Sequence, residues 1–292
     1  MKNISDTKRE SAQLYPTKLR VLTFNLWSFT KPYETRQRII KNELADINPD
    51  LMVFTEAGMD KNRHQVQSLL ADLDYQIIHQ FDRHTDLPFD MGLCLASRWK
   101  MNIVGETDLN NHNFKRNYPA GAIAVHVDCP QPIGKILLIG AKPIWQPNKE
   151  IEREHSSLEL ARLAQKHKTA FPTIIAGDFD ALPDHASIRF LTGKQSLKGE
   201  SAYFQDAWEE AGDENMGYTW PSDSNTARSD TVRLIPDRSY DRRIDYIFLG
   251  SKYDHPDRYA FVRSCQRVFN APTGGVWPSD HFGVLAEIQT DP

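Results

Sequence analysis

The sequence predicts an α/β protein in which mixed or antiparallel sheets are covered by helices. Three observations support this prediction. Short apolar, β-branched segments alternate loosely with amphipathic helical segments. Several predicted strands follow one another with no helix between them, which is not the order of a doubly wound parallel sheet. Of the 292 residues, 40% are hydrophobic and 25% are charged, a composition typical of a chain that folds around a large core.

We expect this chain to form one domain. It has no internal sequence repeat, no low-complexity tract and no shift in composition that would mark a linker. Residues 1–18 show no regular apolar pattern and are expected to be a flexible leader. The single domain would then span residues 19–292.

The first half of the chain opens with a strand, a helix and a second strand. Residues 19–26 are apolar and β-branched, residues 34–48 carry apolar side chains at helical spacing, and residues 51–58 form another apolar run. A second helix is predicted over residues 63–73. The further strands of this half are predicted at 75–80, 91–97, 121–128 and 135–142, the last two as a hairpin.

The second half begins with a long amphipathic helix over residues 150–168, followed by a buried strand over residues 172–181. Two shorter helices and a polar loop come next, at 185–191, 203–212 and 221–240. Three strands close the chain, at 243–250, 259–269 and 281–288.

Charge and cysteine content argue against several classes of protein. Because 35 Lys and Arg face 39 Asp and Glu, the formal net charge is −4, and bulk positive charge would not hold this protein on nucleic acid. The three cysteines form no Cys-X-X-Cys pair, which argues against a disulfide framework and a zinc–thiolate site. Residues 1–18 lack the apolar run of a secretory signal, and no stretch approaches the ~20 apolar residues of a membrane span. We therefore expect a cytoplasmic protein.

Polar side chains stand at or just beyond the ends of five predicted strands. They are Asn25, Glu56, Asp178, Asp245 and Asp280. Taken singly, each is more commonly a cap or turn residue. In the sequence GDFD (177–180), however, two carboxylates one residue apart would repel each other unless a metal, a cation or a proton shares their site. In SDH (279–281), the aspartate can bind a metal while the histidine handles a proton or a phosphate.

In their order along the chain, these motifs resemble the endonuclease/exonuclease/phosphatase superfamily, the fold of DNase I-like nucleases, sphingomyelinases and inositol-polyphosphate phosphatases. The likeness covers residues 19–288. The motifs that carry it are TFNLW (23–27), VFTEAG (53–58), AGDFDALP (176–183), YTWP (218–221), RIDYIFL (243–249) and WPSDHFGVLAEI (277–288). The resemblance implies a DNase I-like four-layer α-β-β-α sandwich, with two mixed or antiparallel sheets flanked by helices.

The resemblance also implies a divalent cation at one end of the paired sheets, usually Mg²⁺, with Mn²⁺ as the alternative. Glu56 matches the principal metal ligand of the family, and Asn25 and Asp280 match residues on or beside the metal. The chemistry of these side chains agrees with that assignment, because hard oxygen ligands suit Mg²⁺.

Three further residues match the catalytic groups of the family. Asp178 matches the carboxylate that orients or deprotonates the attacking water. His281 matches the imidazole that contacts the scissile phosphate, and Asp245 matches the carboxylate that orients this imidazole. A metal and a cationic side chain would together offset the charge of an in-line phosphoryl transition state.

The chain departs from the family pattern at two positions. The family carries Thr-His-Leu before the long helix, whereas this chain has Gly-Ala-Lys-Pro (140–143), which leaves Lys142 nearest to the missing histidine. Asp180 stands where the family has asparagine. The sequences KPIWQ (142–146) and GDFDA (177–181) resemble a bacterial branch of the family that has KPxWQ and GDFDA at these places.

An ionised aspartate cannot donate a hydrogen bond to a phosphate oxygen, whereas a lysine brings a positive charge. We therefore hypothesise that Lys142 and Asp180 are close together, and that Lys142 takes over phosphate stabilisation from the missing histidine. The alternative is a solvated lysine at a strand end and an aspartate in a turn.

Aromatic and basic residues near the motifs are candidates for substrate contacts. Four tryptophans lie beside the motifs, Trp27, Trp145, Trp220 and Trp277, and of these Trp145 and Trp277 are the candidates for substrate binding. Packing in the core is the commoner role of tryptophan, and stacking on a base, a sugar or a lipid-like group is the alternative. Arg243 belongs to a stretch, residues 227–243, with five arginines and three aspartates that either meets substrate phosphates or pairs with itself.

Together these features predict a Mg²⁺-dependent phosphoesterase that hydrolyses a phosphodiester or phosphomonoester by in-line attack of water. A small-molecule or nucleotide-type substrate is slightly favoured. A nuclease acting on DNA or RNA is the alternative, and it would need a continuous basic groove. A third reading is a binding module that kept the fold and its metal or phosphate site but lost efficient catalysis. No obligate protein partner is expected.

Overall fold

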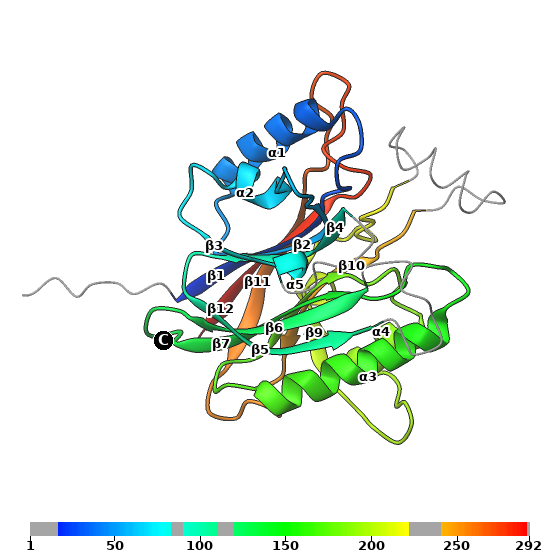
Figure 1. The fold of residues 1–292 in the computed structure, drawn as a ribbon. Helices are drawn as coiled ribbons and strands as arrows, with labels where there is room; N and C mark the ends of the chain where they lie inside the picture. The colour runs from blue at the N-terminus through cyan, green and yellow to red at the C-terminus, as the bar shows by residue number, and fades with distance from the viewer. Residues whose placement is uncertain (1–16, 83–89, 110–119, 222–240, 291–292) are drawn as a thin grey trace, which may run out of the picture.

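The computed structural model describes residues 17–82, 90–109, 120–221 and 241–290. Within these ranges, two six-stranded sheets lie face to face, and helices cover their outer faces (Figure 1). The order of layers is α-β-β-α, which confirms the fold class expected from the sequence. No helix in the described ranges is long and apolar enough to cross a membrane.

The first sheet has the strand order β11-β12-β1-β2-β4-β3. Its central pair, β1 and β2, is parallel and is connected by the helix α1, whereas the neighbouring strands pair antiparallel. The elements of this half are β1 (Lys18–Asn25), α1 (Tyr33–Ile47), β2 (Leu51–Gly58), α2 (Gln65–Leu69), β3 (Gln76–His79), β4 (Met91–Ser97), β11 (Ala260–Val268) and β12 (Gly283–Thr290).

The second sheet has the order β5-β6-β7-β8-β10-β9. Its parallel pair is β7 and β8, connected by α3, and it again occupies the third and fourth places. The two sheets therefore repeat one arrangement, although the sequence shows no repeat. The elements are β5 (Met101–Asp108), β6 (Gly121–Asp128), β7 (Lys135–Lys142), α3 (Glu150–His167), β8 (Ile174–Asp178), α4 (Ala186–Leu191), β9 (Phe204–Asp206), α5 (Ala207–Ala211) and β10 (Asp245–Gly250).

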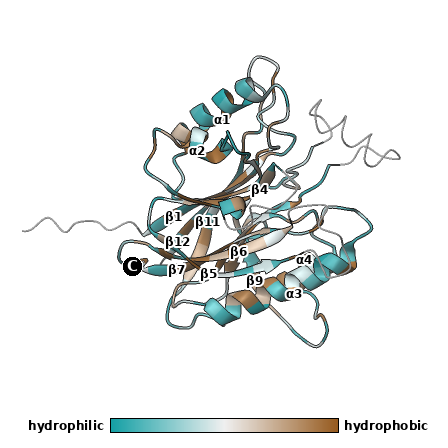
Figure 2. Ribbon diagram, viewed as in Figure 1, coloured by the Kyte–Doolittle hydropathy of each residue, from teal (hydrophilic) through white to brown (hydrophobic). Residues whose placement is uncertain are grey.

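Apolar side chains fill the spaces between the layers. The central cluster joins inward-facing residues of both sheets, such as Val53 and Leu138, and two outer clusters join the sheets to α1 and α3. Figure 2 shows apolar residues along the strands and polar residues along α1. Gly140 lets the sheets approach closely, because a Cβ there would lie 2.9 Å from Cδ1 of Leu95 and 3.2 Å from Cγ1 of Val53.

Three sequence predictions differ from the structure. The predicted helix over residues 203–212 is a short strand, β9, followed by α5, because residues 204–206 pair with β10 and the Asp206 side chain caps the helix at the Trp208 amide, 3.0 Å away. The predicted helix over residues 63–73 is helical only at Gln65–Leu69. The strand β5 was not predicted, because it is a half-exposed edge strand with an irregular register and lacks a clear apolar alternation.

The predicted leader, residues 1–18, and the predicted polar loop, residues 221–240, fall almost wholly outside the described residues. The division of the chain into a leader and a single domain therefore stays a prediction.

His79, at the end of the edge strand β3, is a buried titratable group that contacts the inner strand β2. Its Nε2 lies 3.1 Å from the carbonyl oxygen of Ala57 in β2, and its Nδ1 lies 3.1 Å from the amide nitrogen of Phe81. A neutral ring with its proton on Nε2 satisfies both contacts. Burial lowers the pKa of His79 from its ordinary value of 6.5 to about 4, although the carbonyl of Ala57 opposes this shift.

The free energy of unfolding should decrease as the pH falls from 6.5 towards 4, because the unfolded chain then binds a proton that the folded chain resists. The shift corresponds to a loss of about 3 kcal/mol near pH 4. Urea denaturation at pH 7 and pH 4.5 measures it. His79→Gln keeps an amide donor for Ala57 and should remove this part of the acid loss; an undiminished loss would rule out His79 as its source.

Candidate active site

Side chains from both sheets meet at one end of the sandwich. On the first sheet, Asn25 ends β1, and His281 lies just before β12. On the second sheet, Lys142 ends β7, Asp178 ends β8, and Asp245 begins β10 directly opposite Asp178 in the antiparallel register. All five side chains are buried. We call this group, together with Asp180, the rim cluster.

The hypothesis that Lys142 lies close to Asp180 is confirmed by the structure. The ammonium of Lys142 donates hydrogen bonds to Oδ2 of Asp178, at 2.7 Å, and to Oδ2 of Asp180. Lys142 is only 2% exposed, so the alternative of a solvated strand-end charge is wrong. Its ammonium neutralises part of the charge of two buried carboxylates that would otherwise repel each other.

The two aspartates respond differently to this environment. Burial raises the pKa of Asp178, but the Lys142 and His281 cations outweigh burial and bring this pKa below its ordinary value. Burial and the neighbouring Asp178 carboxylate raise the pKa of Asp180, with Lys142 opposing them. Asp178 is therefore the carboxylate that stays ionised and can accept hydrogen bonds from a water molecule.

The local backbone places both aspartates through one turn. Gly177 has a φ of 155°, and a Cβ there would lie 1.9 Å from the carbonyl oxygen of Ala141, so only glycine allows β8 to lie this close to β7. Asp180 has a left-handed φ of 50°, and its amide donates to Oδ1 of Asp178 at 3.2 Å. This turn directs both carboxylates to the same ammonium.

His281 links the two sheets. Its Nδ1 lies 2.9 Å from Oδ2 of Asp245, and its Nε2 lies 4.0 Å from Oδ2 of Asp178. Burial lowers the pKa of His281, but the Asp245 and Asp178 carboxylates outweigh burial and raise it to about 10. Burial also raises the pKa of Asp245 to about 6, with His281 opposing. The pair is therefore ionised at neutral pH, with Nε2 directed toward Asp178.

Asn25 makes the second contact between the sheets. Its side-chain nitrogen donates to Oδ2 of Asp178 at 3.0 Å, and the same nitrogen lies 3.4 Å from Nε2 of His281. Its side-chain oxygen accepts from the amide of Trp27 at 2.9 Å. The amide group of Asn25 is thus oriented from both ends.

Glu56 and Asp280 come from neighbouring segments of the first sheet. Glu56 lies in the irregular part of the β2–β4 pairing and has a left-handed φ of 48°. Its carbonyl accepts from the amide of Ser28 at 2.9 Å. Asp280 is buried, and the Ser279 hydroxyl beside it donates to the carbonyl of Asn25 at 2.8 Å. These contacts tie the segments of Asn25, Glu56 and Asp280 to one another.

Carboxylate and imidazole groups in this region form a candidate metal site. Ligand atoms of Asp178, Asp245 and His281 all lie within 4.8 Å of one another. The Oδ1 atom of Asp245 is buried and has no hydrogen-bond partner among the described residues. A surplus of buried oxygen ligands is the donor set that a hard divalent cation prefers.

Sequence reasoning missed two residues that organise the site. Arg36 in α1 is 1% exposed, and its guanidinium donates to the carbonyls of Leu26, Thr30 and Pro278. Thr219 accepts the amides of Ile244 and Asp245 on its hydroxyl, at 3.1 and 3.2 Å. Thr219 lies in the YTWP motif (218–221), which marks its position in the sequence but not its role, whereas nothing in the sequence around Arg36 distinguishes it from a surface arginine.

The candidate substrate-contact residues lie apart from these bonds. Arg243 is 5% exposed and pairs with Asp206 at 2.6 Å, so its charge is held inside the second sheet. Trp277 is half-buried and stacks on Phe282, with ring centroids 5.6 Å apart, and Trp145 is also half-buried. The ring that does approach the cluster is Trp220, 6.4 Å from His281. Most of the arginine-rich stretch 227–243 lies outside the described residues.

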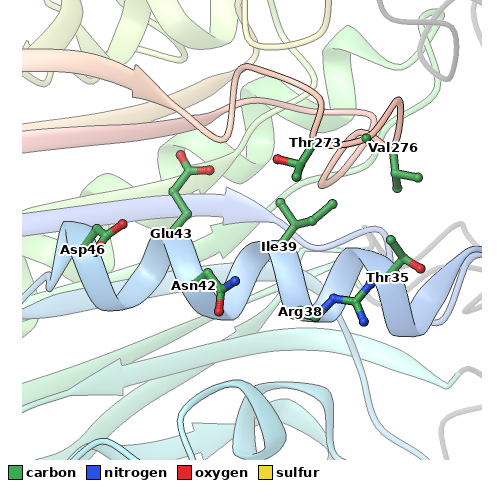
Figure 3. A pocket seen from close by; sticks show the side chains of 9 residues that line it. Thr35, Arg38, Ile39, Asn42, Glu43, Asp46, Thr273 and Val276 are labelled. Atoms are coloured by element: carbon green, nitrogen blue, oxygen red, sulfur yellow. The ribbon is translucent and has the colours of Figure 1, made fainter.

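A hollow of about 550 Å³ lies between α1 and the segment 273–276 (Figure 3). Its lining mixes one positive side chain, Arg38, with the acidic Glu43 and Asp46. None of the nine residues that line it belongs to the rim cluster, and we assign it no part in the chemistry.

The comparisons with known proteins agree with this geometry. The sequence pattern described as the Endonuclease/Exonuclease/phosphatase family matches residues 22–281, which include every member of the rim cluster. The chain belongs to the endonuclease/exonuclease/phosphatase family. No curated protein matches its sequence.

Several solved structures share the fold at low sequence identity. D. rerio TDP2 complexed with a single-strand DNA product has a TM-score of 0.69 and 18% identity, covering 94% of this chain and 100% of that one. The human nocturnin catalytic domain with a bound sulfate anion has a TM-score of 0.66 and 18% identity, covering 94% and 95%. An endonuclease/exonuclease/phosphatase from Bacteroides vulgatus has a TM-score of 0.65 and 19% identity, covering 94% and 100%.

Replacing Lys142 with methionine should lower the free energy of unfolding by about 3–5 kcal/mol, because two buried carboxylates lose their cation. Adding Asp180→Asn to Lys142→Met should recover part of this loss, since one of the two charges is then removed. Urea denaturation at pH 7 measures both effects.

Lys194→Met is the matched control, because Lys194 pairs with Glu209 at 2.7 Å on the surface. This replacement should lower the free energy of unfolding by less than about 1 kcal/mol. If Lys142→Met cost no more than this control, the buried ammonium would not be the counter-charge described above.

Proposed function

We propose that this protein is a divalent-cation-dependent phosphoesterase that hydrolyses a phosphate ester by in-line attack of water. The observation that carries the proposal is the buried set of Asn25, Asp178, Asp245 and His281, with two contacts across the sheets and an ionised imidazole directed into the site. A purely structural cluster would not need four buried polar groups at one end of the sheets that are hydrogen-bonded to one another.

Glu56, Asn25 and Asp280 are the residues that we propose to hold the cation. The alternative is the group Asp178, Asp245 and His281. In that group, however, Asp178 already accepts the Lys142 ammonium and Asp245 is paired with His281, so a divalent ion there would meet fixed positive charge. Mg²⁺ is the cation that this oxygen donor set favours, and Mn²⁺ accepts similar ligands.

The chain's own groups then have separate tasks. Asp178, ionised and oriented by Asn25 and Lys142, positions the attacking water and accepts its proton. His281, held by Asp245, presents Nε2–H to a phosphate oxygen. A bound cation would supply Lewis-acid polarisation of the phosphoryl group.

The role of Lys142 changes from the one hypothesised for it. Because both carboxylates hold its ammonium, Lys142 acts on phosphate indirectly: it balances the charge of Asp178 and Asp180 where the family has a histidine and an asparagine. The negative potential that two aspartates would otherwise present to a phosphate is thereby reduced. Asp180 is its counter-ion in this arrangement.

We propose a phosphorylated small molecule or nucleotide as the substrate. The net charge of −4 and the enclosure of Arg243 by Asp206 support a small substrate over a long polyanion. Trp145 and Trp277 are proposed to contact the substrate's non-phosphate part, whereas Arg243 is proposed to support β10. A nuclease is the second candidate, since a TDP2 structure of the same fold holds a single-strand DNA product.

A panel of substrates tests the reaction class. Purified protein with Mg²⁺ or Mn²⁺ is offered nucleotides, sugar phosphates, phospholipid headgroups, and single- and double-stranded nucleic acid. Turnover should be seen on at least one class and should fall at least about a hundredfold in Asp178→Asn and in Glu56→Gln. Glu159→Gln, which replaces an exposed side chain on α3, is the control for differences between protein preparations.

The absence of turnover on every class, or variants as active as wild type, would contradict the proposal. Calorimetric titration of Mg²⁺ separates the two metal assignments: weakening by Glu56→Gln and not by Asp178→Asn supports the proposed ligands. Cation binding without turnover would favour the binding module instead. An activity on nucleic acid that falls steeply with salt would favour the nuclease.

A further inference from the structure

Arg36 is a buried cation whose guanidinium is surrounded by three backbone carbonyls. Nε donates to the carbonyl of Pro278 at 2.8 Å, Nη1 to that of Thr30 at 2.6 Å, and Nη2 to that of Leu26. Its guanidinium carbon also lies 4.9 Å from the centre of the Trp27 ring. Burying a guanidinium is costly even when carbonyls accept its hydrogen bonds, and here the carbonyls come from two segments that are distant in sequence.

The three carbonyls belong to the segments that carry the proposed cation ligands. Leu26 follows Asn25 directly, and Pro278 lies two residues before Asp280. The loop 26–30 is bonded in turn to β2, because the amides of Leu26 and Ser28 donate to the carbonyls of Thr55 and Glu56, both at 2.9 Å. One guanidinium therefore connects, directly or through one loop, all three ligand-bearing segments.

We propose that Arg36 is a positioning residue for the cation site: it holds the segments of Asn25, Glu56 and Asp280 at the relative placement that binding a divalent cation requires. This inference rests on the proposed function, because it takes these three residues as the ligand set. A planar guanidinium suits the task, since its N–H groups leave in fixed directions that a lysine ammonium cannot reproduce.

The positive charge of Arg36 and its positioning role have opposite effects on the affinity of the site for a divalent cation. It interacts favourably with Asp280 and Glu56, so it competes with a cation for their negative charge. Removing the charge alone would therefore tighten cation binding, whereas loss of positioning would weaken it. The sign of the change separates the two roles.

The chain offers a matched control in Arg153. Like Arg36, it is 1% exposed, is the fourth residue of its helix, and donates to three carbonyls, here those of Ile144, Gln146 and Pro147 in the preceding loop. Unlike Arg36, it also pairs with Glu150 at 2.8 Å. Each arginine also lies eleven residues beyond the end of the strand before it, at Asn25 for Arg36 and at Lys142 for Arg153. Arg153, however, contacts none of the segments that carry the proposed ligands.

Calorimetric titration of Mg²⁺ and Mn²⁺ into the whole protein, without substrate, tests the inference. Arg36→Lys keeps the charge and Arg36→Gln removes it. Both should raise the Kd at least about tenfold, the range found when groups that orient metal ligands are changed. Arg153→Lys should leave the Kd within about twofold of wild type at a similar cost in thermal stability. Circular dichroism ensures that each titrated sample is folded.

Three results would overturn the inference: an unchanged Kd in Arg36→Lys, a tighter Kd in Arg36→Gln, or an equal weakening by Arg153→Lys. If wild type itself bound no divalent cation, the proposed function would fail rather than the placement of Arg36 alone. The two failures are therefore distinguishable in one set of titrations.

Discussion

The rim cluster depends on one buried ammonium. Five carboxylates gather at this end of the sandwich, and Lys142 is the side chain that places a cation between two of them, Asp178 and Asp180. Bringing such carboxylates together in a low-dielectric interior is unfavourable unless a cation shares their charge. With the ammonium in place, Asp178 stays ionised and can bond to Asn25 and face His281. The geometry of the other groups follows from that one pairing.

The division of tasks between the sheets explains how one small region can hold so much charge. The first sheet supplies Glu56 and Asp280, whose segments are bonded to Arg36, and the second supplies the aspartates that are bonded to Lys142. Asn25 and His281 reach across, each to an aspartate of the opposite sheet. Each sheet thus carries a counter-charge on or beside its parallel strand pair, and the His281 imidazolium of the first sheet adds positive charge beside Asp178 and Asp245 of the second.

The sequence was most informative where a strand ended in a polar residue. Asp178, Asp245 and His281 could be expected to lie together because the order of their motifs resembles that of the family, and the layers could be predicted from apolar runs and from that resemblance. The contact between Lys142 and Asp180 could be hypothesised from two departures from the family pattern together with charge, because two carboxylates one residue apart needed a partner. Arg36 could not be found in this way, because its hydrogen-bond partners are backbone carbonyls, which every residue has and which no sequence pattern identifies. Arg243 was misleading for the opposite reason: its neighbours along the chain are basic, but its partner Asp206 is distant in sequence.

Gly140 gives the site an unexpected dependence on the apolar interior. The glycine lies two residues before Lys142, where the absence of a Cβ lets β7 approach Leu95 and Val53 of the other sheet. The hydrogen bonds from Asn25 and His281 span the same gap farther along, and hydrogen bonds tolerate changes of only a few tenths of an ångström. The volumes of the side chains between the sheets therefore help to set the distance between the two halves of the rim cluster. Evolution or design could retune the distance between the two halves of the site by exchanging methyl groups in the core, with every polar residue left unchanged.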